Sequence, residues 1–158
     1  DCLSRNVFSC YRNRYAAMDC RITAHMLTEQ RFPGGASGIG FEICRYFLGK
    51  GGAHVVILDN NPTSGSAAVG KLTAEFSNAS LSFIECNAAS WASQAAAFEQ
   101  VHSKHGRIDV VFANAGIFEK EHLYGTDVTK LQEPNITVID VNVNGVIYCE
   151  KYSHPILW

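Results

Sequence analysis

Glycines cluster at residues 34–40, ahead of an amphipathic run and an apolar run that ends in an acid. The cluster reads Gly-Gly-Ala-Ser-Gly-Ile-Gly, and the apolar run 54–58 is followed by Asp59, which lies 19 residues beyond Gly40. Such glycines let backbone N–H groups approach a pyrophosphate at the positive end of the next helix. A carboxylate at this spacing is suited to hydrogen-bond the adenine-side ribose. Together these residues predict half of a dinucleotide-binding site.

The elements that must position these residues alternate between helix and strand. The first helix is expected to bury Ile39, Ile43, Phe47 and Leu48, which recur on one helical face. The uninterrupted apolar run 108–112 suits a parallel strand that is covered on both faces. This alternation predicts βαβ units and a Rossmann-like, doubly wound parallel sheet of the α/β class, with helices on both faces. The expected elements are helices 38–50, 64–78 and 91–105, and strands 54–58, 81–85 and 108–112.

The stretch that follows allows two structures. Residues 141–148 alternate, are rich in β-branched side chains and contain Asn144-Gly145, which is a strong hairpin signal. However, Ile136, Ile139, Val143 and Val146 also fit one helix face, and a proline is tolerated in a first helical turn. Local sequence alone favours the hairpin slightly.

Composition bounds the function classes. The chain has 158 residues, 47% of them hydrophobic and 18% charged, which suits one globular domain. A formal net charge of -2 gives no support for binding to nucleic acid or to a membrane surface, and no apolar run is long enough to span a bilayer. The cysteines form no CxxC pair or zinc spacing, and His102 and His105 lack neighbouring ligands, so no metal site is expected. Cys44 and Cys86 lie among apolar residues, which indicates packed thiols and a cytoplasmic protein.

Residues 1–33 differ from the rest of the chain. They carry five arginines and three acids, whereas residues 34–158 carry more acids than bases. Tyr15, Met18, Ile22 and Met26 recur at helical spacing, which predicts an amphipathic helix at 16–30. We therefore divide the chain into an atypical, helical N-terminal extension (1–33) and a partial dinucleotide-binding domain (34–158). The arginines also allow an alternative interpretation of this stretch as a mitochondrial targeting segment.

From Gly34 onward the chain resembles the short-chain dehydrogenase/reductase superfamily, and in particular its NAD-dependent members similar to hydroxyprostaglandin dehydrogenase. The family motif TGxxxGxG is matched at Gly34, Gly38 and Gly40, with Pro33 in place of the threonine. The family's NNAG is matched at residues 114–116, with Ala113 in place of its first asparagine. Residues 140–146 resemble the family helix that carries a catalytic asparagine. The resemblance thus favours a helix at 134–153.

The resemblance implies a cofactor, a substrate class and a partner. The cofactor is NAD, because Asp59 has no arginine beside it that could receive a 2′-phosphate. The substrate is a small alcohol or ketone, and helix 134–153 packs against a second subunit in a homo-oligomer. The implied site residues are Gly34, Ser37, Gly38, Ile39 and Gly40 for the pyrophosphate, Asp59 for the ribose, Asn87 at the place of the family's adenine-contacting acid, Asn114, Ala115 and Gly116 for the adenosine wall, and Asn142 as the catalytic asparagine.

Two departures from the family pattern predict an incomplete fold and an incomplete site. The family's first strand falls on residues 27–33, where Glu29, Gln30 and Arg31 are unsuited to a strand buried on both faces. The family's catalytic serine and its YxxxK follow the asparagine helix, but this sequence stops at Trp158. The single YxxxK, Tyr46 to Lys50, lies inside the first helix. We therefore expect an NAD-dependent alcohol oxidoreductase whose chain is inactive alone; the alternative is a non-catalytic nucleotide-binding or interaction module.

Overall fold

A computed structural model describes residues 38–50, 54–118 and 133–153 of the chain. The expected helix at 16–30, the atypical stretch 27–33 and residues 34–37 of the glycine turn, which include the predicted site residues Gly34 and Ser37, lie outside the described residues. None of the described helices is both long and apolar enough to cross a membrane.

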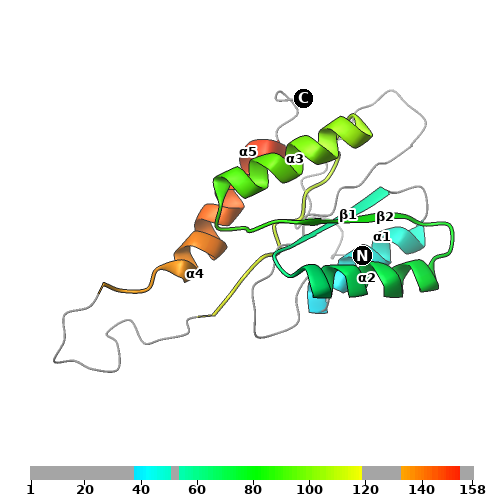
Figure 1. Cartoon of the computed structure of the whole chain (residues 1–158), viewed down its shortest axis with the longest axis horizontal. Helices are drawn as coiled ribbons and strands as arrows, with labels where there is room; N and C mark the ends of the chain where they lie inside the picture. Colours follow the sequence, from blue (N-terminus) through cyan, green and yellow to red (C-terminus); the bar gives the residue numbers. More distant parts are fainter. Residues whose placement is uncertain (1–37, 51–53, 119–132, 154–158) are drawn as a thin grey trace, which may run out of the picture.

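The described elements follow the alternating order that the sequence predicts (Figure 1). Helix α2 starts after Asn61, whose side-chain oxygen accepts hydrogen bonds from the N–H groups of Thr63 and Ser64 at 3.0 and 3.1 Å. Helix α3 starts after the capping hydroxyl of Ser90 and ends at Gly106, whose φ of 77° suits glycine. The elements are α1 (Gly38–Lys50), β1 (His54–Asp59), α2 (Pro62–Glu75), β2 (Ser80–Glu85), α3 (Trp91–His105), α4 (Thr137–Ile139), η1 (Asp140–Asn144) and α5 (Gly145–Ser153).

The two strands form a parallel pair joined by α2. Their register places His54 opposite Ser80 and Asp59 opposite Glu85, so both strands end at the same edge. Side chains of β1 alternate between two cores, because successive residues of a strand point to opposite faces. This βαβ unit confirms the predicted parallel connection.

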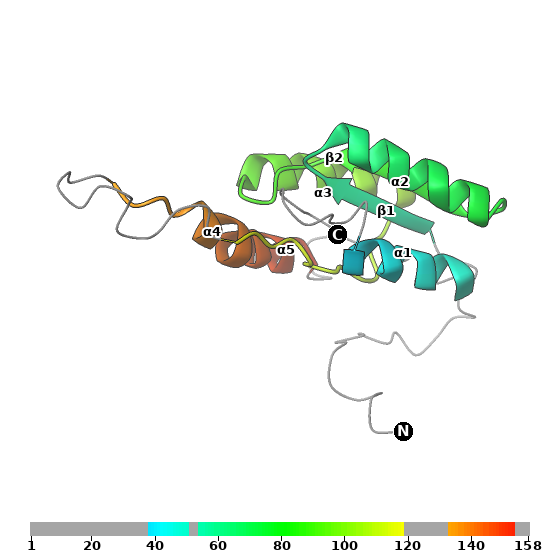
Figure 2. The same ribbon diagram turned by 90° about the horizontal axis from the view of Figure 1, so that it is seen from below.

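Helices cover both faces of the pair. On one face Val55 and Ile57 pack with Cys44 of α1 and Leu72 of α2. On the other face, Val56 and Leu58 pack with residues of α3, η1 and α5. Figure 1 shows α1 and α2 on one side of the strands and α3 and α5 on the other, and Figure 2 shows α1 and α2 flanking β1. The three layers confirm the Rossmann-like, doubly wound class in a partial form.

The predicted strand at 108–112 is wrong for the described structure. Residues 107–118 carry no strand, and the described sheet contains only β1 and β2. The segment still packs inward, since Ile108 and Val111 join one core and Phe112 the other. A strand exists only with a neighbour that completes its backbone ladder. In the family order that neighbour is the first strand, which falls on residues 27–33, outside the described residues.

The last stretch is helical, as the resemblance favoured. Helical structure runs from Thr137 to Ser153, and the central turn η1 is a π-helix. The predicted start was early: Pro134 precedes the helix, and the side chain of Asn135 accepts a hydrogen bond from the N–H of Thr137 at 3.0 Å. The π turn was not foreseen.

Candidate cofactor site

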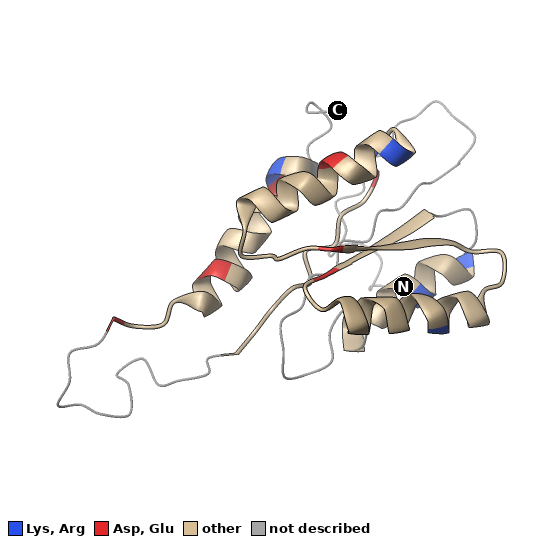
Figure 3. Cartoon of the chain, viewed as in Figure 1, with Lys and Arg blue, Asp and Glu red and all other residues tan. Residues whose placement is uncertain are grey.

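The candidate site lies at the carboxyl edge of the strand pair. Only three residues separate the end of α1 from the start of β1, so α1 runs back along β1 and begins near the edge where β1 ends. Gly38 has a φ of 65°, a backbone conformation that glycine adopts without strain. Figure 3 shows acidic colour at the carboxyl end of each strand, where Asp59 and Glu85 are the last residues. In this class of fold, ligands bind at that edge.

Asp59 ends β1 as a buried carboxylate that is only 2% exposed. Its Oδ1 accepts a hydrogen bond from the N–H of Asn61 at 2.9 Å. The cap of the following helix α2 is the side chain of Asn61. The aspartate is therefore held in place by the turn that leads into α2, at the position where the family pattern puts the ribose-binding acid.

Asn87 follows β2 in a tight turn. Its Oδ1 accepts a hydrogen bond from the N–H of Ala89 at 2.9 Å, and its own N–H donates to the hydroxyl of Ser93 at 2.9 Å. The preceding thiol, Cys86, is buried, and burial raises its pKa to about 11, against a smaller lowering by a hydrogen bond with Ser93. The turn thus fixes the backbone of Asn87 next to Asp59, because the N–H of Cys86 donates to the Asp59 carbonyl at 2.9 Å.

Asn142 in η1 pairs with the backbone that follows Asn114, Ala115 and Gly116. Its Oδ1 accepts a hydrogen bond from the N–H of Ile117 at 2.8 Å, and its Nδ2 donates to the Ile117 carbonyl at 2.9 Å. A Cβ on Gly116 would lie 3.7 Å from the same Oδ1. The structure therefore brings the two motifs together. This pairing equally suits a purely structural role for Asn142, because π turns and backbone-bonding side chains both reshape a helix.

Sequence reasoning missed Gln94, which is fully buried on α3. Its Nε2 donates to the carbonyls of Ala88 and Gly145 at 2.7 and 3.0 Å, and its Oε1 lies 3.2 Å from the Cys149 sulfur. A glutamine on a surface helix is usually read as solvent-facing. The signal was its position on the same face as Phe98 and Val101, which lie four and seven residues further along.

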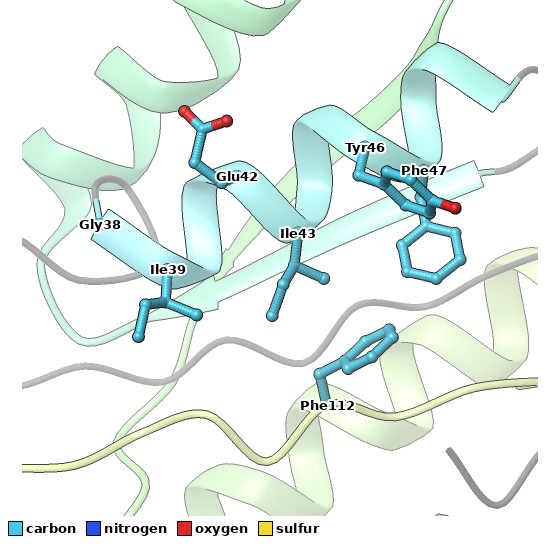
Figure 4. A pocket seen from close by; sticks show the side chains of 7 residues that line it. All are labelled: Gly38, Ile39, Glu42, Ile43, Tyr46, Phe47 and Phe112. Carbon is cyan, nitrogen blue, oxygen red and sulfur yellow. The ribbon is translucent and has the colours of Figure 1, made fainter. Parts of the chain in front are cut away.

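The expected burial of Ile39 is wrong. Ile39 is 75% exposed, whereas Leu48 and Cys44, which was predicted to be a packed thiol, are buried. Ile43 and Phe47 are partly buried and pack against the same core. Figure 4 shows Ile39, Ile43 and Phe47 pointing toward the side where Phe112 lies, and Glu42 pointing away. The apolar face of α1 is wider than its contact with β1, so one flank lines a groove of about 850 Å³. The groove is lined by Gly38, Ile39, Glu42, Ile43, Tyr46, Phe47 and Phe112.

The Tyr46–Lys50 pair on α1 does not form the arrangement of a proton relay. The Lys50 ammonium lies over the Tyr46 ring, 5.1 Å from its centroid, which is a cation–π contact. Tyr46 is 59% exposed and its ring meets Phe47 edge-on. A lysine that activates a tyrosine has to lie near the hydroxyl and in a cofactor site, so this geometry argues against a role of the pair in proton transfer.

Sequence comparisons identify relatives of this arrangement. The chain matches the short chain dehydrogenase family over residues 33–157. It is 33% identical over 123 residues to short-chain dehydrogenase/reductase prx4 of Penicillium rubens, covering 76% of this chain and 33% of that protein. It is 32% identical over 124 residues to momilactone A synthase of Oryza sativa subsp. japonica, covering 78% of this chain and 43% of that protein. The chain thus spans less than half the length of these curated relatives.

Solved structures share the fold. A putative short-chain dehydrogenase from Novosphingobium aromaticivorans superposes with a TM-score of 0.68 at 23% identity, over 86% of this chain and 45% of that one. YwfH, an NADPH-dependent reductase involved in bacilysin biosynthesis, superposes with a TM-score of 0.66 at 17% identity, over 85% of this chain and 52% of that one. At these identities the likeness concerns the fold alone.

Proposed function

The chain belongs to the short-chain dehydrogenase family, and we propose on that premise that it forms the cofactor-binding part of an NAD-dependent oxidoreductase. The substrate we propose is a small alcohol or ketone. When bound, the nicotinamide would supply the hydride acceptor or donor. The chain's own part is to bind and orient that cofactor.

The observation that carries the proposal is the buried carboxylate of Asp59 at the carboxyl end of β1. A ribose with two free hydroxyls can donate hydrogen bonds to such an acid, whereas a 2′-phosphate would meet it with like charge. The next residues, Asn60 and Asn61, provide no cation to neutralise that phosphate. NAD is therefore the preferred cofactor in this proposal, and NADP binds more weakly.

We assign the other parts of the cofactor to residues along the carboxyl edge of the strand pair. The pyrophosphate lies at the start of α1, held by backbone N–H groups of the turn that includes Gly34, Ser37 and Gly38 to Gly40. The adenosine lies between Asn87 and the segment Asn114–Gly116. Asn142 stands next to that segment through its pairing with Ile117. The 158-residue polypeptide contains no YxxxK outside α1, so we propose that it binds the cofactor without turning over substrate.

Calorimetry with NAD and NADP tests the proposal. We expect tighter binding of NAD. Asp59→Ala should weaken NAD binding about tenfold to hundredfold and narrow the preference for NAD over NADP, since hydrogen bonds to charged groups contribute about 1.5–3 kcal/mol. Asp109→Ala is the matched control, because Asp109 pairs with Arg107 at 3.1 Å instead. Tighter binding of NADP by the unaltered chain would contradict the assignment of Asp59.

Two further properties belong to the same proposal. Residues on one flank of the last helix stay exposed although they are apolar, among them Ile139, Val143 and Ile147, which are 50%, 45% and 56% exposed. A second copy of the chain would cover them, so we propose a homo-oligomer through helix 134–153. The described cysteines Cys44, Cys86 and Cys149 are buried in the apolar core, as packed thiols are, and on this ground we propose a cytoplasmic location.

A further inference from the structure

We propose that Gln94 is a positioning residue: its carboxamide holds the turn after β2 and the start of α5 together, and thereby places Asn142 against Ile117. The proposal rests on the proposed function for its link to the cofactor, but its geometric part does not. The junction joins three elements, since the carbonyls that Gln94 binds belong to Ala88 and Gly145.

Chemistry fixes the orientation of the carboxamide. The carbonyl oxygens of Ala88 and Gly145 accept hydrogen bonds and cannot donate them, so the NH₂ group must face both. The Oε1 then faces the sulfur of Cys149 at 3.2 Å, and the thiol is the donor. Burial raises the pKa of Cys149 to about 12, which keeps its proton in place at neutral pH. Every polar atom of the buried side chain thus has a partner.

The backbone approach at this junction is unusually close. A Cβ on Gly145 would lie 3.0 Å from the Ala88 carbonyl oxygen and 3.5 Å from the Ala88 carbonyl carbon. Two carbonyls turned toward one region repel each other unless a donor lies between them, and the Gln94 NH₂ group supplies both hydrogen bonds. Without it, either the helix moves away or two buried carbonyls lose a partner.

Such a movement would reach Asn142 and the cofactor turn. Asn142 lies three residues before Gly145 in the same continuous helical segment, and its two hydrogen bonds to Ile117 are 2.8 and 2.9 Å long. A shift of the helix by less than one ångström would weaken both, because hydrogen bonds tolerate little lengthening. On the other side, Ala88 follows Asn87 directly. Gln94 therefore couples the adenine-side turn to the asparagine.

The test replaces Gln94 by methionine, which has similar length and no donor. The matched control is Gln100→Met, at an exposed position of the same helix. The readout is amide hydrogen exchange of the Ile117 N–H, measured without cofactor and divided by the exchange of the β1 amides, so that general loss of stability cancels. We expect Gln94→Met to raise this ratio about tenfold and Gln100→Met to leave it unchanged.

A ratio that is the same in Gln94→Met and in the unaltered chain would overturn the proposal. If Gln94→Met does not fold, Cys149→Ala takes its place, because it removes the hydrogen bond that the thiol donates to Oε1 and so loosens the carboxamide. A ratio raised at least twofold supports the proposal, and an unchanged one overturns it. Calorimetry with NAD tests the link to the cofactor, where Gln94→Met should weaken binding and unchanged affinity would refute the link. Failure of the unaltered chain to bind NAD refutes the proposed function alone, since the exchange ratio needs no cofactor.

Discussion

Replacing Gly65 by alanine is expected to destabilise the fold, although alanine is the better helix former. Gly65 lies in α2, where a Cβ would come within 2.6 Å of Cζ of Phe83 and closer still to two other carbons of that ring. Alanine therefore forces either the ring or the helix to move. Helix α2 approaches β2 this closely because the side chain at residue 65 is a hydrogen.

The size of the effect follows from two opposed contributions. Overpacking a close contact costs about 1–3 kcal/mol, whereas replacing glycine by alanine inside a helix gains about 0.5–1 kcal/mol. Phe83 is half-buried, so its ring can move partly toward solvent, which reduces the cost. We expect a net loss of about 1–2 kcal/mol in the free energy of unfolding. At Gly70, on the same helix, no atom lies within 4 Å of the added Cβ, so Gly70→Ala should stabilise by up to about 1 kcal/mol.

Urea unfolding of the two variants measures this contrast. A double variant, Gly65→Ala with Phe83→Leu, should recover part of the loss, because the smaller side chain leaves room for the methyl group. Binding should respond as well: the N–H of Gly65 donates to the Asn61 carbonyl at 2.9 Å, and Asn61 in turn holds the Asp59 carboxylate. Gly65→Ala that is as stable as the unaltered chain would refute the close packing of α2 on β2.

Three other outcomes are expected. Burial raises the pKa of Cys86 to about 11 and that of Cys149 to about 12, above the value of about 8.5 for an unfolded thiol, so unfolding releases protons at alkaline pH. The free energy of unfolding, measured with urea, should therefore be constant below about pH 8.5 and fall between there and pH 11–12. In Cys149→Ala it should fall less steeply. Ile147→Glu should reduce self-association in sedimentation experiments, since it places charge on the exposed apolar flank. The chain should oxidise no secondary alcohol in a spectrophotometric NAD assay, and turnover that Tyr46→Phe abolishes would show that this tyrosine is a catalytic base.

Helix bounds were predicted well for α1 and α3, whereas the predicted range 64–78 lies two to three residues beyond α2 (Pro62–Glu75). The predicted ranges 38–50 and 91–105 agree with α1 and α3. The α3 boundaries come from the Ser90 hydroxyl at the start and the left-handed Gly106 at the end, which are properties of a few adjacent residues. Such signals are visible in the sequence because no distant contact is needed to make them work.

Features that depend on distant partners were not predictable in the same way. The run 108–112 has the composition of a strand, but a backbone ladder also needs a neighbour, and composition says nothing of where that neighbour lies. The burial of Gln94 depends on the carbonyls of Ala88 and Gly145, six and 51 residues away in sequence. The helical period can place Gln94 on the buried face of its helix, but it cannot show that backbone carbonyl acceptors lie opposite that face.

The Asn144-Gly145 dipeptide shows how one local pattern can serve another purpose. In a hairpin the glycine would provide a positive φ, but here Gly145 has a φ of -58° and lies in a helix. The fold requires a residue without a side chain at this position, because the Ala88 carbonyl fills the space where a Cβ would lie. The β-branched residues around it lie on two different faces of the helix: Val141 is buried in the core, whereas Val143 and Val146 are exposed. The local sequence does favour a hairpin, but a tertiary contact overrides that preference and makes the segment helical. The family resemblance indicated this helix, whereas local propensity could not.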